Sequence, residues 1–267
     1  MINTRLGINT NVFIDYSFTS FLEEIKDMGY EGVEIARTHA LHEKTGEELN
    51  GIKRKLEENN LEVYCIQGGI PHTDLNYAKK RIDLASVIGA KYVNIGPGIE
   101  VERNFKTNGA WKETAEIFSE LADYAASRKV LVAIEPEPMI PLSFNRPLLT
   151  TYKEVKRMLN QLSSDNMRVI LDIAHVHVAK ENFSKVVNDL GGKIAVVHVS
   201  DVVDDRHYHF IPGKGGINFK AVLKTLYKSG FDGFLSVEVY PYFNEPKRAA
   251  IESIRFLTNL LYEIDLK

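Results

Sequence analysis

The chain has 267 residues, of which 44% are hydrophobic and 26% charged, and its formal net charge is −3. This length and composition allow one large α/β domain with a full core. The slightly acidic balance gives no support to a nucleic-acid partner or a polybasic membrane anchor. No stretch reaches the roughly 18 apolar residues of a membrane span. The single cysteine, Cys65, cannot form an intramolecular disulfide. We therefore expect a cytoplasmic protein with neither a membrane nor a nucleic-acid partner.

Strand-like and helix-like segments alternate from end to end. The predicted strands are 5–9, 32–35, 61–66, 92–95, 130–134, 169–171, 194–197 and 234–237. Two helices are predicted to stop at Gly29 and Gly89, because glycine commonly ends helices, and others cover 45–59, 108–128, 151–161, 180–190, 218–229 and 244–264.

Eight strand–helix pairs average about 33 residues each, a period typical of a (β/α)8 barrel. We therefore predict an α/β protein with a single TIM-barrel domain over residues 1–267. A doubly wound open sheet is the alternative. It is disfavoured because no G-x-G-x-x-G follows an early strand.

Four residues that commonly bind metal ions each follow or end a predicted strand. They are Glu135, Asp172, His198 and Glu238, separated by 37, 26 and 40 residues. In a parallel barrel the carboxyl ends of the strands meet at one rim, so these side chains can converge on one ion. Three carboxylates and one imidazole predict a site for Mn, Mg, Co or Zn rather than a thiolate site.

Further polar residues surround these four positions. His175 follows Asp172 in a D-x-x-H pattern, which places an imidazole beside a hard oxygen ligand. A polar loop at 204–216 follows the seventh strand, and Arg206 is its best candidate for holding a substrate oxygen. The Gly-rich end of this loop is either an anion site made of backbone N–H groups or a flexible turn. Asp201 is expected to orient His198 or to cap this loop.

In their order and spacing these residues resemble the xylose isomerase-like TIM barrel superfamily, which includes ketose 3-epimerases, inosose isomerases, dehydratases and type IV apurinic endonucleases. The resemblance covers essentially the whole chain. It implies a single-metal site at Glu135, Asp172, His198 and Glu238, with Glu135 and Glu238 moving a proton on the substrate. It also implies substrate-binding roles for His175 and Arg206, and a homodimer or homotetramer.

The favoured function is a divalent-metal-dependent isomerase or epimerase of a small ketose, inosose or related polyhydroxy ketone, working through a metal-bound enediolate. The same site becomes a dehydratase if the intermediate expels a hydroxyl group. The endonuclease alternative is weaker. Those enzymes need further histidines after strands three and four, where this chain has Gln67-Gly68-Gly69 and Gly96-Pro97-Gly98. A non-catalytic sugar-binding protein is the remaining hypothesis.

Overall fold

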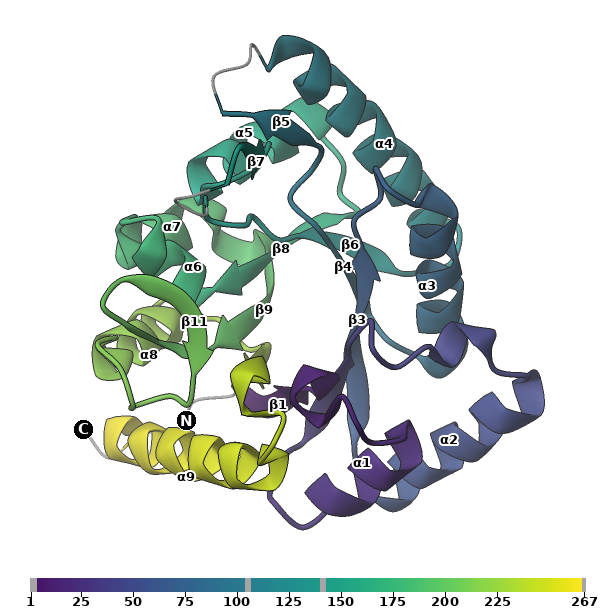
Figure 1. The fold of residues 1–267 in the computed structure, drawn as a ribbon, viewed down its shortest axis with the longest axis vertical. Coiled ribbons are helices and arrows are strands. Elements are labelled where there is room, and N and C mark those ends of the chain that lie inside the picture. The colour runs from purple at the N-terminus through teal and green to yellow at the C-terminus, as the bar shows by residue number, and fades with distance from the viewer. Residues whose placement is uncertain (1–3, 104–106, 140–142, 266–267) are drawn as a thin grey trace.

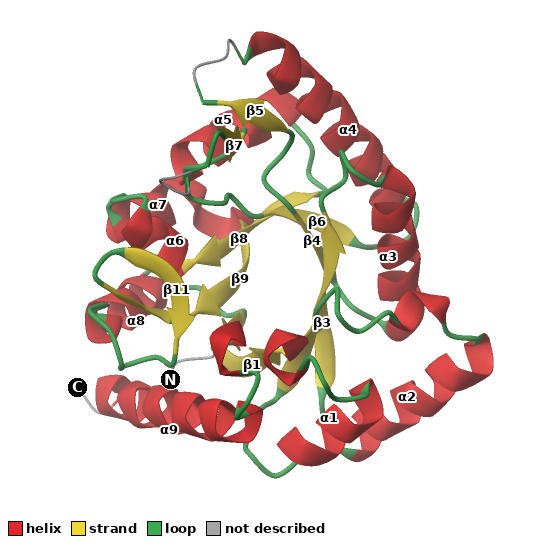
Figure 2. Ribbon diagram, in the orientation of Figure 1, coloured by secondary structure: helices red, strands yellow, loops and turns green. Residues whose placement is uncertain are grey.

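A closed barrel of eight parallel strands forms the centre of the molecule, in the order β1-β12-β9-β8-β6-β4-β3-β2. The computed structural model describes residues 4–103, 107–139 and 143–265. The barrel strands are β1 (Arg5–Asn9), β2 (Gly32–Ile35), β3 (Glu62–Gly69), β4 (Tyr92–Ile95), β6 (Leu131–Ile134), β8 (Met167–Asp172), β9 (Ile194–Val199) and β12 (Phe234–Val237). Viewed end-on, they form a ring at the centre with helices around it (Figure 1, Figure 2). The predicted (β/α)8 fold is confirmed.

Helices follow the barrel strands and cover their outer face (Figure 2). They are α1 (Phe18–Ile25), α2 (Gly46–Glu58), α3 (Leu75–Ile88), α4 (Asn108–Ala126), α5 (Tyr152–Leu162), α6 (Ile173–Val178), α7 (Phe183–Leu190), α8 (Phe219–Lys228) and α9 (Pro246–Asp265). Capping boxes begin α2 at Thr45 and α5 at Thr151, so these N-termini are fixed by local sequence. No helix of the described residues is long and apolar enough to cross a membrane.

Two short antiparallel pairs lie outside the barrel. One joins β5 (Glu100–Glu102) to β7 (Asn145–Pro147), and the other joins β10 (Asp201–Val203) to β11 (Arg206–Phe210). The second pair follows β9, at the same end of the barrel as the predicted ligands. It was not predicted from the sequence, where the region was described as a polar loop.

A stacked aromatic pair fills part of the barrel interior. The rings of Tyr64 and Phe234 lie 4.0 Å apart at an interplanar angle of 15°. Gly7 of β1 lies against Tyr64, and a Cβ at this position would be 2.4 Å from the ring. Glycine is therefore required at position 7 by this close approach. The Tyr64 hydroxyl donates a hydrogen bond of 2.7 Å to Ser236 Oγ, which links this packing to the polar groups described next.

Candidate functional site

The four predicted ligands converge at the carboxyl end of the barrel. Glu135 follows β6, Asp172 ends β8, His198 lies in β9 and Glu238 follows β12. Each offers one ligand atom, and these atoms all lie within 4.8 Å of one another. Asp172 and His198 are direct neighbours in the parallel register of β8 and β9. The barrel therefore assembles one site from residues that span more than 100 positions in sequence.

His198 is at the centre of this group. Its Nδ1 lies 2.8 Å from Glu135 Oε1, 3.1 Å from Glu238 Oε2 and 3.9 Å from Asp172 Oδ2. Burial alone would lower the pKa of His198, but the surrounding glutamates outweigh it and hold the pKa well above its usual value. In turn, His198 overcomes the effect of burial on Glu135 and Glu238 and lowers the pKa of both. Both glutamates are therefore ionised and available as ligands or bases near neutral pH.

Neutral side-chain amides hold the outer oxygens of the two glutamates. Asn94 donates a hydrogen bond of 2.6 Å to Glu135 Oε2. Asn9 donates one of 3.2 Å to Glu238 Oε1, and Gln67 donates one of 3.4 Å to the same oxygen. Because each amide fixes one oxygen, the other oxygen of each glutamate remains directed toward His198. These donors orient the carboxylates without adding charge to the site.

The donor set fits a divalent cation. Asp172 is fully buried, and its Oδ1 accepts a hydrogen bond from the backbone N–H of His175, but its Oδ2 has no hydrogen-bond partner among the residues that the structure describes. A buried unpaired carboxylate oxygen is costly. A cation bound among the four residues would give Asp172 Oδ2 a partner, and oxygen-rich ligation of this kind suits Mn, Mg, Co or Zn.

Glu34 is a fifth member of the group that the sequence reasoning missed. It lies in β2, is fully buried, and its Oε2 is 2.9 Å from His198 Nε2. Ser236 Oγ donates a hydrogen bond of 2.8 Å to the same oxygen. A carboxylate that accepts the Nε2 proton of His198 directs Nδ1 toward the ligand group. The sequence feature that could have identified Glu34 is the presence of a glutamate within an otherwise apolar barrel strand, Gly32-Val33-Glu34-Ile35.

The two predicted substrate-binding residues occupy different environments. His175 lies buried on α6, with its Nε2 only 3.7 Å from Asp172 Oδ2. Burial would lower its pKa, but nearby carboxylates, led by Asp172, raise that pKa to about 9. Arg206 is exposed, and it pairs with Val203 at the turn between β10 and β11. Among the described interactions, no hydrogen bond or ion pair joins Arg206 to the four ligands, so its role stays a prediction.

Two histidines of β11 also reach the site, although neither was among the predicted site residues. His209 is buried, and its Nδ1 lies 3.6 Å from Glu238 Oε2. Its neighbour His207 lies 3.4 Å from Glu137, which follows the ligand Glu135 by two residues. Burial, reinforced by nearby histidines, lowers the pKa of His207 to about 3. Burial raises the pKa of Glu137 to about 7. The sequence feature that could have identified His207 and His209 is the His-Tyr-His alternation, but the strand that contains it was not predicted.

Asp201 organises the Gly-rich end of the loop. Its carboxylate accepts backbone N–H groups from Gly213 at 3.0 Å, Gly215 at 2.8 Å and Ile217 at 3.0 Å. The expectation that Asp201 caps this loop is confirmed. The N–H groups of Gly213 and Gly215 are therefore engaged by a buried internal carboxylate, which leaves the proposed external anion site without these two donors.

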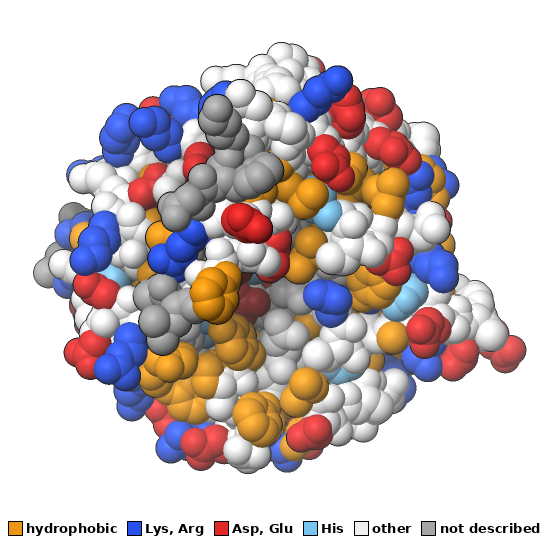
Figure 3. Space-filling model, turned by 45° about the horizontal axis from the view of Figure 1, so that its top comes forward, with side chains coloured by type: hydrophobic (Ala, Val, Ile, Leu, Met, Phe, Trp, Pro, Cys, Tyr) orange, Lys and Arg blue, Asp and Glu red, His pale blue; other side chains and the backbone are white. Residues whose placement is uncertain are grey.

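A hollow lies near the middle of one face of the molecule, with acidic side chains in and beside it (Figure 3). Hydrophobic side chains gather along one side of the same hollow. Such a combination suits a small polar ligand that is bound through a few directed polar groups beside apolar walls.

Known proteins with related sequences include several carbohydrate enzymes. The chain is 26% identical over 257 residues to fructoselysine 3-epimerase of Shigella flexneri, covering 88% of this chain and 91% of the relative. It is 27% identical over 171 residues to inosose isomerase of Bacillus velezensis, covering 61% and 58% of the two chains. A 3-dehydroshikimate dehydratase of Pseudomonas aeruginosa is 26% identical over 90% of this chain, which matches 39% of that longer protein.

Solved structures share the same fold. A crystal structure of the IolI protein with a bound zinc atom has a TM-score of 0.82 at 20% identity, covering 98% of this chain and 99% of that one. A D-tagatose 3-epimerase-like protein has a TM-score of 0.81 at 21% identity, covering 98% of both chains. The sequence model of the xylose isomerase-like TIM barrel family matches residues 22–260. The chain belongs to the xylose isomerase-like TIM barrel family.

Proposed function

We propose that this protein is a sugar isomerase or epimerase that acts on a small polyhydroxy ketone and depends on one divalent ion. The observation that carries the proposal is the placement of Glu135 and Glu238 together beside one nitrogen of His198, at 2.8 and 3.1 Å from its Nδ1. Relatives named as a 3-epimerase and an inosose isomerase support this reaction class. The small-molecule partner, the homo-oligomer and the cytoplasmic location remain predictions.

Glu135, Asp172, His198 and Glu238 would hold the ion. When bound there, a divalent cation would polarise the substrate carbonyl and stabilise the negative charge that develops on its oxygens. The choice among Mn, Co, Mg and Zn is open, because all four accept carboxylate and imidazole ligands.

Proton transfer is assigned to the two glutamates. One of Glu135 and Glu238 removes the proton from the carbon next to the carbonyl, and the same residue or the other returns it. Both carboxylates are ionised, since His198 lowers the pKa of each. Asn94 and Asn9 hold their outer oxygens in place during the transfer. His175, buried beside Asp172, is placed to contact a substrate hydroxyl.

Dehydration is the second candidate, supported by the dehydratase relative. The first step would be the same proton abstraction by a glutamate. The outcome would differ because a carbon–carbon double bond forms while the hydroxyl group on the next carbon takes up the abstracted proton and leaves as water. The two reactions are therefore distinguished by their products and not by the residues that begin them.

The test follows the exchange of carbon-bound hydrogen in heavy water by NMR. Fructoselysine, inosose and simple ketoses are incubated with the protein and Mn, Co, Mg or Zn. We expect exchange with at least one substrate, and its loss by more than about 100-fold in Glu238→Gln and Glu135→Gln. The control is Glu100→Gln, which changes an exposed carboxylate on β5. Retained turnover in correctly folded Glu238→Gln protein would refute the role given to this residue.

A further inference from the structure

A cavity of about 420 Å³ lies between α5 and α7, on the outside of the barrel. The two helices are neighbours there (Figure 1). Three buried residues form its apolar part, namely Tyr152 of α5 with Val186 and Leu190 of α7. The residues that line it include none of the four predicted ligands. Its volume is in the range of small-molecule sites, about 300–1,000 Å³, so the α5–α7 cavity is a candidate second binding site.

Positive charge is in excess among the charged residues that line the α5–α7 cavity. They are three lysines and two acidic residues, Lys153, Lys156, Lys185, Glu181 and Asp189. Two of the lysines share one carboxylate, because Lys156 Nζ is 2.9 Å and Lys185 Nζ is 3.0 Å from the oxygens of Asp189. Lys153 is exposed, and its ammonium group has no ion pair or hydrogen bond among the residues that the structure describes. The cavity therefore has a free cation at its edge.

The second carboxylate, Glu181, is engaged by the backbone. It accepts the N–H of Tyr152 at 2.9 Å and the N–H of Lys153 at 3.4 Å, at the start of α5. Its own N–H donates a hydrogen bond of 3.0 Å to the carbonyl oxygen of Val176 in α6. A carboxylate at a helix N-terminus is favoured by the orphan N–H groups and the helix dipole. The negative charge of Glu181 is thus directed at α5, and the lysines remain to attract an anion.

Tyr152 connects the α5–α7 cavity to one of the predicted metal ligands. Its hydroxyl oxygen accepts a hydrogen bond of 2.6 Å from the backbone N–H of Asp172, and the hydroxyl donates one of 3.1 Å to the carbonyl oxygen of Ile170. A ligand packed against Tyr152 would keep this hydroxyl on the N–H of Asp172. It would therefore favour the arrangement in which the Asp172 side chain faces the other three predicted ligands, since a ligand stabilises the conformation that it binds best.

We propose that the α5–α7 cavity binds a small amphipathic anion, with a carboxylate or phosphate group at the lysines and an apolar body against Tyr152, Val186 and Leu190. The bound anion acts as an effector: through Tyr152 it raises the affinity of the four predicted ligands for their divalent ion. The pocket and its link to Asp172 do not depend on the proposed function, whereas the effect on ion affinity rests on the ion site of that proposal. By thermodynamic linkage, the ion raises the affinity for the anion by the same factor.

Isothermal titration of chelator-treated full-length protein with octanoate and with phenyl phosphate tests the pocket. We expect saturable binding of at least one probe, weakened by about 5-fold in Lys153→Met, which removes the unpaired ammonium group. Val186→Phe fills the apolar part of the cavity and should abolish binding. Inorganic phosphate and 1-octanol each carry half of the required chemistry and should bind more weakly than the probes. The matched control is Lys224→Met, an exposed change on α8 that should leave the affinity unchanged.

Two further measurements test the link to Asp172. In the absence of metal, the amide NMR signal of Asp172 should shift as the probe is added. In Mn titrations, a saturating probe should tighten ion binding by about 5-fold or more, the lower end of typical coupling between two sites. Tyr152→Phe keeps the ring at the cavity but removes the oxygen that accepts the N–H of Asp172. This variant should still bind the probe, with no effect on the Asp172 signal or on Mn affinity.

Several outcomes would overturn the proposal. One is the absence of saturable probe binding at millimolar concentrations, and another is equal binding by the wild type, Lys153→Met and Val186→Phe. Dimerisation that Val186→Phe abolishes would mean that a second copy of the chain covers the cavity, which would overturn the small-molecule assignment. Probe binding that leaves both the Asp172 signal and Mn affinity unchanged would overturn the effector role. If the probe binds and shifts the Asp172 signal but the protein takes up no ion, the proposed function fails and the pocket stands.

Discussion

Glu34 connects the packed interior of the barrel to the ligand group. The Tyr64 hydroxyl donates to Ser236 Oγ, Ser236 Oγ donates to Glu34 Oε2, and the same Glu34 oxygen lies 2.9 Å from His198 Nε2. The imidazole of His198 is thereby held from the side opposite to the other carboxylates. Its orientation depends on residues of β2, β3 and β12 that lie outside the group of four predicted ligands.

Replacing Glu34 by Gln should weaken binding of the proposed divalent ion without unfolding the protein. The amide keeps the size of the carboxylate but removes the charge that supports the Nε2 proton of His198. Losing such a supporting group costs about 10–100-fold in metal affinity. Isothermal titration with Mn measures the effect. Glu62→Gln, an exposed change on the neighbouring β3, is the control. Equal affinity in Glu34→Gln and the wild type would show that Glu34 does not support His198.

The convergence of Glu135, Asp172, His198 and Glu238 could be predicted from the sequence, because each closes or follows an apolar run, where an ionised side chain is unexpected. Glu34 is also an ionisable residue in an apolar segment, but it was harder to recognise because it lies between two apolar residues of β2 and not at the end of the strand. The sequence could not reveal which interior residue would face His198. That depends on barrel closure, which makes β2 and β9 face each other across the interior.

At the scale of elements, α3 fixes the loop after β2 through one buried arginine. Arg81 is fully buried and donates to the carbonyl oxygens of Gln67, His39, Ile35 and Ala36 at 2.9–3.0 Å. These carbonyls belong to the carboxyl ends of β2 and β3 and the turn beyond β2. Arg81 therefore holds the part of the rim from which Gln67 reaches Glu238.

Arg81→Met should lower the free energy of unfolding by more than about 3 kcal/mol, because several buried carbonyl groups lose their donor at once. Urea denaturation followed by circular dichroism measures the change. Lys80→Met, an exposed substitution on the same helix, should change stability by less than about 0.5 kcal/mol. If the two variants have the same midpoint, the hydrogen bonds of Arg81 contribute little net stability.

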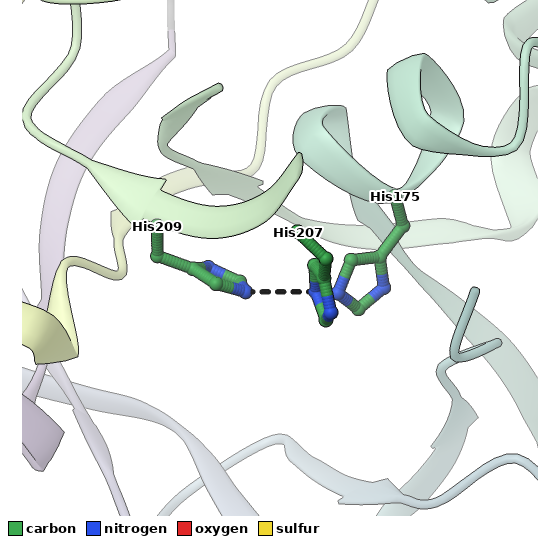
Figure 4. Close-up of side chains that lie close together, drawn as sticks. All are labelled: His175, His207 and His209. Carbon is green, nitrogen blue, oxygen red and sulfur yellow. Dashed lines mark hydrogen bonds between the residues drawn. The ribbon is translucent and has the colours of Figure 1, made fainter. Parts of the chain in front are cut away.

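The barrel elements were predictable because strands and helices differ in hydrophobic period and alternate regularly. Strands β1, β2, β4 and β12 have the predicted limits. The pair β10–β11 was missed because both strands are short, and β11 presents histidines instead of aliphatic residues on its inward face. Helix α6 was missed because it begins directly after Asp172, within the expected loop. These elements carry His175, His207 and His209, so the least predictable part of the fold places three imidazoles together (Figure 4) beside the four predicted ligands.

At the scale of the whole molecule, the proposed metal site joins four strands of the barrel. Glu135, Asp172, His198 and Glu238 come from β6, β8, β9 and β12, which are consecutive neighbours around the ring. A bound ion would therefore connect half of the barrel at its carboxyl end. It would also offset the mutual repulsion of three carboxylates in a buried place. Metal binding and global stability should be linked through this set of residues.

Adding Mn or Zn should raise the melting temperature of chelator-treated protein. A ligand at 100 times its dissociation constant stabilises the folded state by about 2.7 kcal/mol, and for a chain of this size each kcal/mol corresponds to a shift of roughly 2–4 °C. Differential scanning calorimetry with and without chelator measures the shift, which we expect to be about 5–10 °C. Asp172→Asn, which keeps the shape of a ligand but removes its charge, should show a much smaller response.

The stabilisation by metal should also increase with pH. A metal ion binds neutral imidazole, while the neighbouring glutamates hold the pKa of His198 well above its usual value. At a pH below that raised pKa, metal binding must displace a proton from His198. A higher pH therefore favours the metal-bound state, until the pH exceeds the pKa of His198 and the ring is already neutral before the ion binds. The difference in melting temperature between metal-loaded and chelator-treated protein should therefore be larger at pH 8 than at pH 6. A difference that stays constant, or that shrinks as the pH rises, would mean that His198 releases no proton when the ion binds and that the ion is held elsewhere in the molecule.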